Sequence, residues 1–232
     1  MVIHPDKTKS MIIAPRQKLQ LTKPKLNLTL GTSIIEEVKE HKMLGLIVDN
    51  NLTWNKHIEN MIKKLSKNTY LLTKLKRYAK PAHLQMFFNA HIISHINFAS
   101  TIWDGCSQDT FIKLNSVYRR AVRQLDNRQI STDEKLKKLN ILPLRKQLNF
   151  NKTILTHKIY YKKTPDYLTY LLDKTEERYN SNRLRPPLPR IDLYYRSLSY
   201  SGSKLWNKLP QTLKTISHTK TFKKRLRKYI NI

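Results

Sequence analysis

The chain has 232 residues, and its 45 lysines and arginines against 16 aspartates and glutamates give a formal net charge of +29. Because 39% of the residues are hydrophobic, the chain can bury a core, and a folded protein is expected rather than a disordered polycation. Four glycines are too few for a phosphate-cradling loop or a dinucleotide fingerprint, and one cysteine excludes an intramolecular disulfide and a cysteine-based zinc site.

The expected partners follow from the charge. A polycation of this size typically binds a phosphate polymer, because each neutralised phosphate releases a condensed counterion. We therefore expect RNA, DNA or an RNA–DNA hybrid as partner, with an anionic membrane surface as the disfavoured alternative and no small-molecule substrate. The sequence has no signal-peptide pattern and no apolar run near the roughly 20 residues of a membrane span, so a nuclear or cytoplasmic location is expected.

The first quarter of the chain differs from the rest in pattern and charge. Short β-branched or alternating runs at 11–15, 25–30 and 43–49 are separated by turn residues, which predicts strands. Residues 1–55 carry only 8 basic against 5 acidic residues. We place the first boundary near residue 54, so that 1–54 is a small β-rich segment.

Helical spacing of apolar residues then continues to about Leu172. Pro81, Pro143 and Pro165 each stand at or near the first turn of an expected helix, where the missing N–H does no harm. The fold class is therefore mainly α with a small β-rich N-terminal segment (α+β), and we expect a helical domain over 55–130 and a further helical region over 131–173. The expected helices cover 55–78, 81–99, 109–125, 131–138, 143–163 and 165–172.

The last part of the chain is expected to form a linker and a basic module. Residues 174–192 contain Asn-Ser-Asn and Pro-Pro-Leu-Pro, which cannot hold a regular helix, so this segment is interpreted as a linker. In the module 193–232 we expect a strand near 190–197 and a closing amphipathic helix from Thr219 to Ile230. Phe222, Leu226, Tyr229 and Ile230 lie on the apolar stripe of that helix.

Basic residues gather on three helical faces. On the helix 55–78, four lysines fall within an arc of roughly 40° with no acidic residue among them, opposite the apolar side. A second basic face lies on the helix 109–125, and a third cluster closes the chain. One such face is ordinarily a solvated surface, but three of them favour contact with a nucleic-acid backbone. The three sets are Lys56, Lys63, Lys67 and Lys74; Lys113, Arg119, Arg120 and Arg123; and Lys223, Lys224, Arg225 and Arg227.

The sequence offers little that indicates catalysis. His91 and His95 have a spacing that could hold a metal from one helix, but they lack the glutamate of a zincin motif and are interpreted as packing residues. Cys106 shows no nucleophile signature. No pair of aspartates indicates a two-metal centre, so no metal site and no cofactor are expected. Capping of helix ends accounts for Asp104, Asp109 and Asp126, and core or junction positions account for Trp54, Trp103 and Trp206.

Four stretches in order resemble one family. They are HPDKTKSMII, HKMLGLIVDNNLTWNKHIENMIKKL, HIISHINFASTIWDG, and GSKLWNKLP followed by FKKRLRKYI. Together they resemble the C-terminal part of the reverse transcriptases of non-LTR retrotransposons, the LINE-like, jockey-like and CR1-like elements. The resemblance covers nearly the whole chain. It implies that 1–54 is a palm-edge and primer-grip remnant, that 55–130 is a thumb-like helical bundle, and that the remainder is the basic C-terminal region.

The resemblance also implies roles for individual residues. Lys7 matches the palm-edge lysine that assists proton transfer to the leaving pyrophosphate. Leu44 and Gly45 match the primer-grip turn, and the lysine face of 55–78 would follow the template–primer duplex. His4 stands where the family usually has asparagine.

The sequence departs from the family in its catalytic centre. The family holds Mg²⁺ with palm aspartates that include an Asp-Asp pair, and no Asp-Asp pair occurs in this chain. We therefore expect a truncated reverse transcriptase (RNA-directed DNA polymerase) that retains the nucleic-acid-gripping regions and is inactive alone. Two alternatives stay open: a domesticated stand-alone RNA- or DNA-binding protein, and a decayed element fragment without function.

Overall fold

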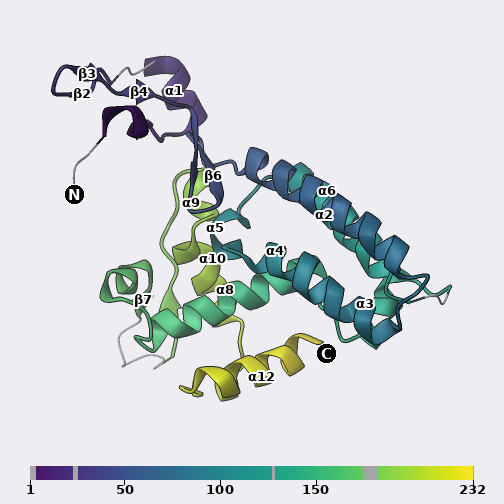
Figure 1. Ribbon diagram of the computed structural model, residues 1–232. Helices are drawn as coiled ribbons and strands as arrows, with labels where there is room; N and C mark the ends of the chain where they lie inside the picture. The colour runs from purple at the N-terminus through teal and green to yellow at the C-terminus, as the bar shows by residue number, and fades with distance from the viewer. Residues whose placement is uncertain (1–3, 23–25, 127–128, 175–181, 232) are drawn as a thin grey trace. The chain divides into compact units, whose positions relative to one another are not determined.

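The computed structural model describes residues 4–22, 26–126, 129–174 and 182–231 (Figure 1). Helices dominate, and the strands are short, as expected for a mainly α chain with an α+β character. The chain divides into two compact units, 1–60 and 61–232. The division falls inside helix α2 (Asn55–Leu75).

The strands described in the first unit form three two-stranded pairings. The strand β1 pairs in parallel with β4, whereas β2–β3 and β5–β6 are antiparallel. The strand predicted at 11–15 is wrong: these residues form no strand, and a helix begins just after Pro15. The elements are η1 (Pro5–Lys7), β1 (Lys9–Ser10), α1 (Arg16–Thr22), β2 (Thr29–Leu30), β3 (Ser33–Ile34), β4 (Glu36–Glu37), β5 (Glu40–Met43) and β6 (Leu46–Asp49).

The hairpin β5–β6 turns over Leu44 and Gly45. Both residues have positive φ angles, 47° and 85°, which is the geometry of a two-residue turn matched to the twist of the strands. Glycine adopts this conformation readily, whereas leucine does so at a cost. The Leu44 side chain is 89% exposed, so packing does not compensate that cost.

Asp49 organises the loop that leads from this hairpin to α2. Its Oδ1 accepts hydrogen bonds from the backbone N–H groups of Asn51 (3.1 Å) and Thr53 (3.0 Å), and its Oδ2 accepts one from Trp54 N–H (2.8 Å). One carboxylate therefore satisfies three backbone donors ahead of the first helical turn. Trp54 is buried, as the sequence predicts.

The helices of the second unit begin close to where the sequence predicts them. Ser107 and Ser131 cap the helices that follow them, and the Ser131 cap is a full capping box with Glu134. The predicted helix 81–99 contains a π-helical turn and ends before Ala99, whose φ is 47°. The elements are α3 (Pro81–Phe88), the π turn η2 (Asn89–Ile93), α4 (Ser94–Asn97), α5 (Ser100–Trp103), α6 (Gln108–Arg123), α7 (Thr132–Lys138) and α8 (Leu144–Tyr160).

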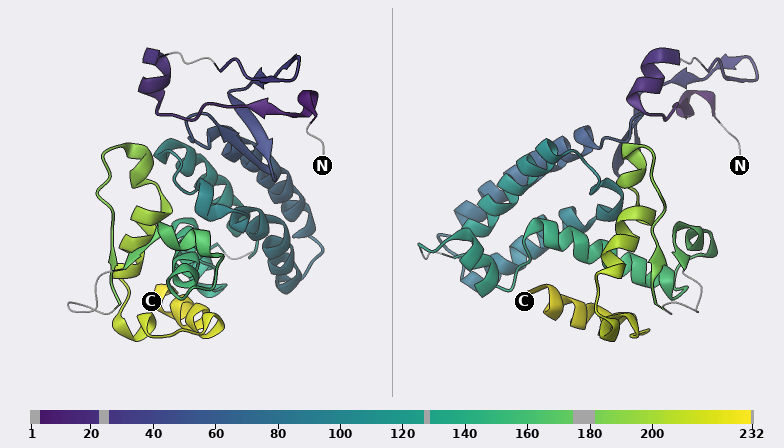
Figure 2. Two further views of the ribbon diagram at one scale, coloured as in Figure 1. Left: turned by 90° about the vertical axis from the view of Figure 1, so that its left-hand side faces the viewer. Right: turned by 180° about the vertical axis from the view of Figure 1, so that it is seen from behind.

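Within this unit, the part of α2 after residue 60 runs beside α6 (Figure 2). The apolar sides of these helices are buried: Leu65 and Leu72 on α2 and Leu114 on α6 are each 0% exposed. The rings of Tyr118 on α6 and Phe88 on α3 are in tilted contact, with centroids 5.8 Å apart. The Tyr118 hydroxyl donates a 2.6 Å hydrogen bond to the carbonyl of Leu142. The cationic sides of the helices are thereby left facing outward.

The C-terminal part differs from prediction in two places. The strand expected near 190–197 is wrong, because Asp192–Tyr195 form α9 and the Ser197 side chain then caps α10. The predicted helix 165–172 is a 3-10 helix. Of the predicted linker 174–192, residues 175–181 lie outside the described residues. The elements are η3 (Asp166–Leu171), β7 (Asp173–Lys174), β8 (Leu184–Arg185), which pairs antiparallel with β7, α9 (Asp192–Tyr195), α10 (Leu198–Asn207), α11 (Gln211–Lys214) and α12 (Thr219–Asn231).

An aromatic cluster holds α10 and α12 against α8. The His157 ring stacks on Phe222 with centroids 4.0 Å apart, and Tyr160 stacks on Trp206 at 4.8 Å. Phe222 and Trp206 are both 0% exposed. The closing helix α12 lies along α8 (Figure 1). Of its predicted apolar stripe, Phe222 and Leu226 are buried and Ile230 is partly buried, whereas Tyr229 is 46% exposed. Among the described residues, no helix is both long enough and apolar enough to cross a membrane.

Candidate nucleic-acid interface

Three of the four predicted lysines on α2 are exposed and have no anionic partner. Lys63 and Lys67 make no hydrogen bond or ion pair with any described residue, and Lys74 Nζ lies 5.3 Å from the ring centroid of Tyr70. Lys56 differs from the prediction of an unpaired face, because its ammonium forms an ion pair with Glu40 of β5. Helical periodicity could not predict this pair, because it relates residues within one helix and Glu40 lies on a strand.

On the second basic face, which lies on α6, three of the four predicted cations likewise form no ion pair with a described residue. Lys113, Arg120 and Arg123 are exposed and form no ion pair with a described residue. Arg119 is half-buried and binds Asp133 of α7 in a bidentate manner, with N–O distances of 2.7 and 3.1 Å. The expectation of an unneutralised Arg119 is therefore wrong.

The Arg119–Asp133 pair has consequences for both pKa values. The hydrogen bonds to Asp133 raise the pKa of Arg119, and the same bonds hold the pKa of Asp133 below its usual value. The pair is exposed on the Asp133 side, so its net stabilisation is small. Two of the guanidinium nitrogens of Arg119 are thereby occupied by Asp133.

Exposed tyrosines lie among the α2 lysines, which the sequence analysis did not single out. Tyr70 is 61% exposed, and Tyr78, which follows α2, is 89% exposed. Aromatic rings interleaved with cations are typical of surfaces that bind single-stranded nucleic acid by stacking. The signal in the sequence is a tyrosine four residues before Lys74.

The third predicted cluster divides into two faces of α12. Phe222 and Leu226 anchor the helix in the core. On the outer side, Lys224 and Arg225 line a shallow hollow together with Lys220 and Lys228. Lys223 and Arg227 line a different cavity, and Arg227 Nη2 donates a 2.9 Å hydrogen bond to the carbonyl of Asn140.

The residues assigned by resemblance lie in the first unit. Lys7 is the last residue of η1, and its side chain is exposed. Leu44 and Gly45 form the turn of the β5–β6 hairpin, so the backbone there is open to solvent. An exposed hairpin tip of this kind allows a polymer to approach the main chain closely.

The described residues contain no group of three or more His, Cys, Asp or Glu side chains able to hold a metal ion. His91 stacks on Phe87 with ring centroids 4.4 Å apart, and burial, followed by Lys64 and His91, lowers the pKa of His95. Burial likewise raises the pKa of the Cys106 thiol. The donor set therefore does not fit the two-carboxylate magnesium centre that the family resemblance implies.

One buried ion pair was not foreseen. Lys152 Nζ lies 2.7 Å from Asp104 Oδ2, with both side chains almost fully buried, and also donates to Ser201 Oγ at 2.8 Å. Burial raises the pKa of Asp104, and the neighbouring Lys152 opposes that rise. Asp104 therefore does more than occupy a helix end: it ties α5 to α8. No local pattern signals a pair so far apart in sequence.

Comparison with known proteins gives no match to any protein-family model, curated protein or solved structure. The function is therefore inferred from the chain's own residues and their chemistry.

Proposed function

We propose that the chain binds nucleic acid through the phosphate backbone, using the cations of α2 and α6. The observation that carries this proposal is the set of six exposed cations with no ion pair to a described residue. Phosphate contacts fix the position of a protein on nucleic acid without reading its sequence, so binding is largely sequence-independent. The six are Lys63, Lys67, Lys74, Lys113, Arg120 and Arg123.

The absence of ion pairs between these six cations and the described residues favours binding over simple solvation. Exposed helices that serve only as surface usually pair Glu with Lys at i,i+4, which offsets charge repulsion. Here Glu59 and Asp109 stand four residues before Lys63 and Lys113 but form no ion pair with them, so much of the repulsion among the cations remains in a chain of net charge +29. A polyanion relieves that repulsion and releases counterions, which is the main source of affinity for phosphate polymers.

We further propose that the cations of α2 and α6 bind nucleic acid in the manner of a reverse-transcriptase thumb. The motif blocks that resemble non-LTR retrotransposon polymerases support this reading, and so does the helical character of 55–130. In that reading α2 is a thumb helix that follows a template–primer duplex, and the Leu44–Gly45 turn is the primer grip. Lys7 acts as an auxiliary proton donor only in a complete catalytic centre.

A stand-alone RNA- or DNA-binding role is the second candidate. The absence of an Asp-Asp pair from the sequence favours it, because polymerisation by this family depends on paired metal-binding aspartates. Both candidates use the same cationic faces. They differ in whether a catalytic partner is required, which primer-extension assays decide.

The binding proposal is tested by neutralising part of α2. We expect Lys63→Gln with Lys67→Gln to weaken binding to several unrelated duplexes by the same factor, and to reduce the steepness of the salt dependence by about 2. Glutamine preserves helix propensity, and circular dichroism checks the fold.

The matched control is Lys137→Gln with Lys138→Gln on α7, which removes two exposed lysines from another helix. The control pair is expected to retain most of the affinity. Equal losses in the two double variants would show that net charge, not the α2 face, determines binding.

A further inference from the structure

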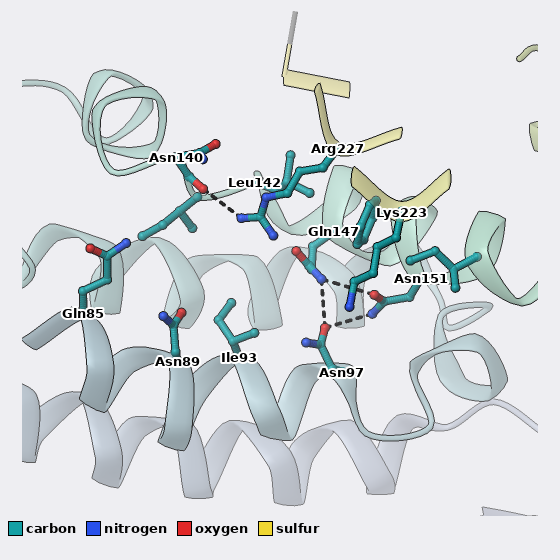
Figure 3. Close-up of a pocket in the computed structure, with 13 residues that line it drawn as sticks. Gln85, Asn89, Ile93, Asn97, Asn140, Leu142, Gln147, Asn151, Lys223 and Arg227 are labelled. Atoms are coloured by element: carbon teal, nitrogen blue, oxygen red, sulfur yellow. Dashed lines mark hydrogen bonds between the residues drawn. The ribbon is translucent and has the colours of Figure 1, made fainter. Parts of the chain in front are cut away.

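A polar cavity of about 180 Å³ lies between the α3–α4 segment, α8 and α12 (Figure 3). The described residues that line it are an unusual set: they include six carboxamides, two cations and no carboxylate. The carboxamides project from the chain at regular helical intervals, since Gln85, Asn89 and Asn97 are separated by multiples of four. A π-helical turn, a feature frequent at functional sites, forms part of the same wall.

Hydrogen bonds hold one side of the cavity in place. Asn97 Oδ1 accepts from Gln147 Nε2 at 3.0 Å and from Asn151 Nδ2 at 2.9 Å, and Asn151 Nδ2 also donates to Ser100 Oγ at 3.0 Å. Gln147 is only 6% exposed. Figure 3 shows this network as a connected set of amides on facing helices. The cavity wall is therefore preorganised without a ligand.

The same network leaves other polar atoms available. Since Asn97 Oδ1 takes both donors, its Nδ2 has no partner among the described residues, and the Asn89 side chain has none either. Gln85 Nε2 donates to the carbonyl of Leu139 at 3.1 Å, which leaves Oε1 as an acceptor. The cavity thus presents both hydrogen-bond donors and acceptors, over an apolar floor that includes Ile93 and Phe150.

The cations stand at the α12 side of the cavity. Lys223 makes no hydrogen bond or ion pair with a described residue, and in Figure 3 its ammonium points toward the amide network. Arg227 uses one nitrogen for the Asn140 carbonyl and keeps further N–H donors. Two cations with no carboxylate among the described lining residues make an anion the preferred occupant of this side.

We propose that this cavity binds one unpaired nucleotide, with its base against the carboxamides and its phosphate on Lys223 and Arg227. Carboxamides match the mixed donor and acceptor edges of nucleobases. The volume lies below the roughly 300–1,000 Å³ of sites for drug-sized ligands, which suits one base and not a longer segment. The proposal rests on the proposed nucleic-acid binding and adds to it a place for an extruded or single-stranded residue.

The first test uses free ligands and the full chain. We expect nucleoside 5′-monophosphates to shift the side-chain amide signals in NMR titrations, whereas ribose 5-phosphate and inorganic phosphate bind about tenfold more weakly. Asn89→Ala with Lys223→Gln is expected to weaken mononucleotide binding at least about fivefold, as loss of a hydrogen bond and a charge contact predicts. Neither residue holds the network, so the fold is retained.

The matched control is Asn149→Ala with Lys158→Gln, which removes the same residue types from α8 outside the cavity lining. It is expected to bind mononucleotides as the unsubstituted chain does. Equal binding of phosphate and mononucleotide, no binding of mononucleotide, or equal loss in the two double variants would each overturn the proposal.

The second test separates this proposal from the general binding function. A duplex with one unpaired nucleotide is compared with the same duplex fully paired. We expect the chain to prefer the interrupted duplex about fivefold, and Asn89→Ala with Lys223→Gln to abolish that preference. If the fully paired duplex binds as tightly as the interrupted one, the cavity proposal is wrong, but the proposed phosphate binding by α2 and α6 is supported. If neither duplex binds, the proposed phosphate binding by α2 and α6 is wrong, and the mononucleotide titration still tests the cavity proposal.

Discussion

His157 shows how a single side chain couples the C-terminal helix to the rest of its unit. The imidazole is 0% exposed, stacks on Phe222 and bonds through Nε2 to the carbonyl of Ile216 at 2.8 Å. A carbonyl oxygen only accepts hydrogen bonds, so Nε2 carries the proton, and the buried Nδ1 has no partner among the described residues. Burial lowers the pKa of His157, with the Ile216 carbonyl acting in the opposite direction.

This lowered pKa predicts a loss of stability in mild acid. The unfolded chain binds a proton at His157 below about pH 6.5, whereas the folded chain resists it until the pH reaches the lower folded-state pKa. Stability is therefore fully present above pH 6.5 and falls as the pH drops through this window, by at most about 1.4 kcal/mol per pH unit from this group. Denaturant unfolding at pH 7.5 and 5.5 measures the loss.

His157→Gln isolates the contribution of this group, because glutamine keeps an N–H donor and does not titrate. The variant is expected to be less stable at pH 7.5, where the ring stack is lost, yet to lose less stability on acidification. Any effect of His95, whose pKa is also lowered, is common to both proteins. The same pH dependence in both proteins would show that His157 does not titrate in this range.

At the scale of elements, the helix boundaries followed from local signals. Ser131 with Glu134, Pro81 and Pro143 mark helix starts in the sequence, and α7, α3 and α8 begin within a residue of those predicted. A strand is expected near 190–197 from the sequence, but residues 192–195 are helical and Ser197 caps α10. A seven- to eight-residue window cannot distinguish these outcomes when tertiary contacts decide them.

The candidate site was predictable only in part, for the same reason. The lysines of α2 share one face at a period that the sequence shows directly. Pairing of Lys56 with Glu40 and of Arg119 with Asp133 depends on elements that meet only in the fold. The amide cavity likewise leaves regular spacings on each helix, such as Gln147 and Asn151, but no pattern states that α8 faces α3 and α4.

The ion pair between α6 and α7 leads to a prediction for the interface. Asp133→Asn would free Arg119 for phosphate, so we expect tighter duplex binding and a salt dependence steeper by about 1. Asp166→Asn, which removes an exposed first-turn carboxylate from η3, controls for the change in net charge. Salt titrations of both variants measure the difference. Identical curves for the two would mean that Arg119 does not contact nucleic acid.

At the scale of the whole molecule, the sequence is rich in basic residues and lacks an Asp-Asp pair. Basic residues exceed acidic ones throughout, and the excess is largest at the C-terminal end, where residues 174–232 hold 15 basic against 3 acidic residues. The carboxylates that would hold two metal ions for nucleotide transfer are not paired in the sequence.

We accordingly expect no polymerase activity from this chain alone. Primer extension on an RNA template, with Mg²⁺ or Mn²⁺ supplied, checks this expectation against a heat-inactivated sample. Incorporation above that background would show that the chain completes a metal centre by another route, and the stand-alone binding function would lose its support.

The central claim is that six cations on α2 and α6 contact phosphates, and the salt dependence of duplex binding tests it most directly. If all six engage, log K plotted against log salt concentration should fall with a slope of about −0.9 × 6, or roughly −5, for unrelated duplex sequences alike. A slope near −1, or affinities that differ strongly between sequences at equal salt, would contradict the account.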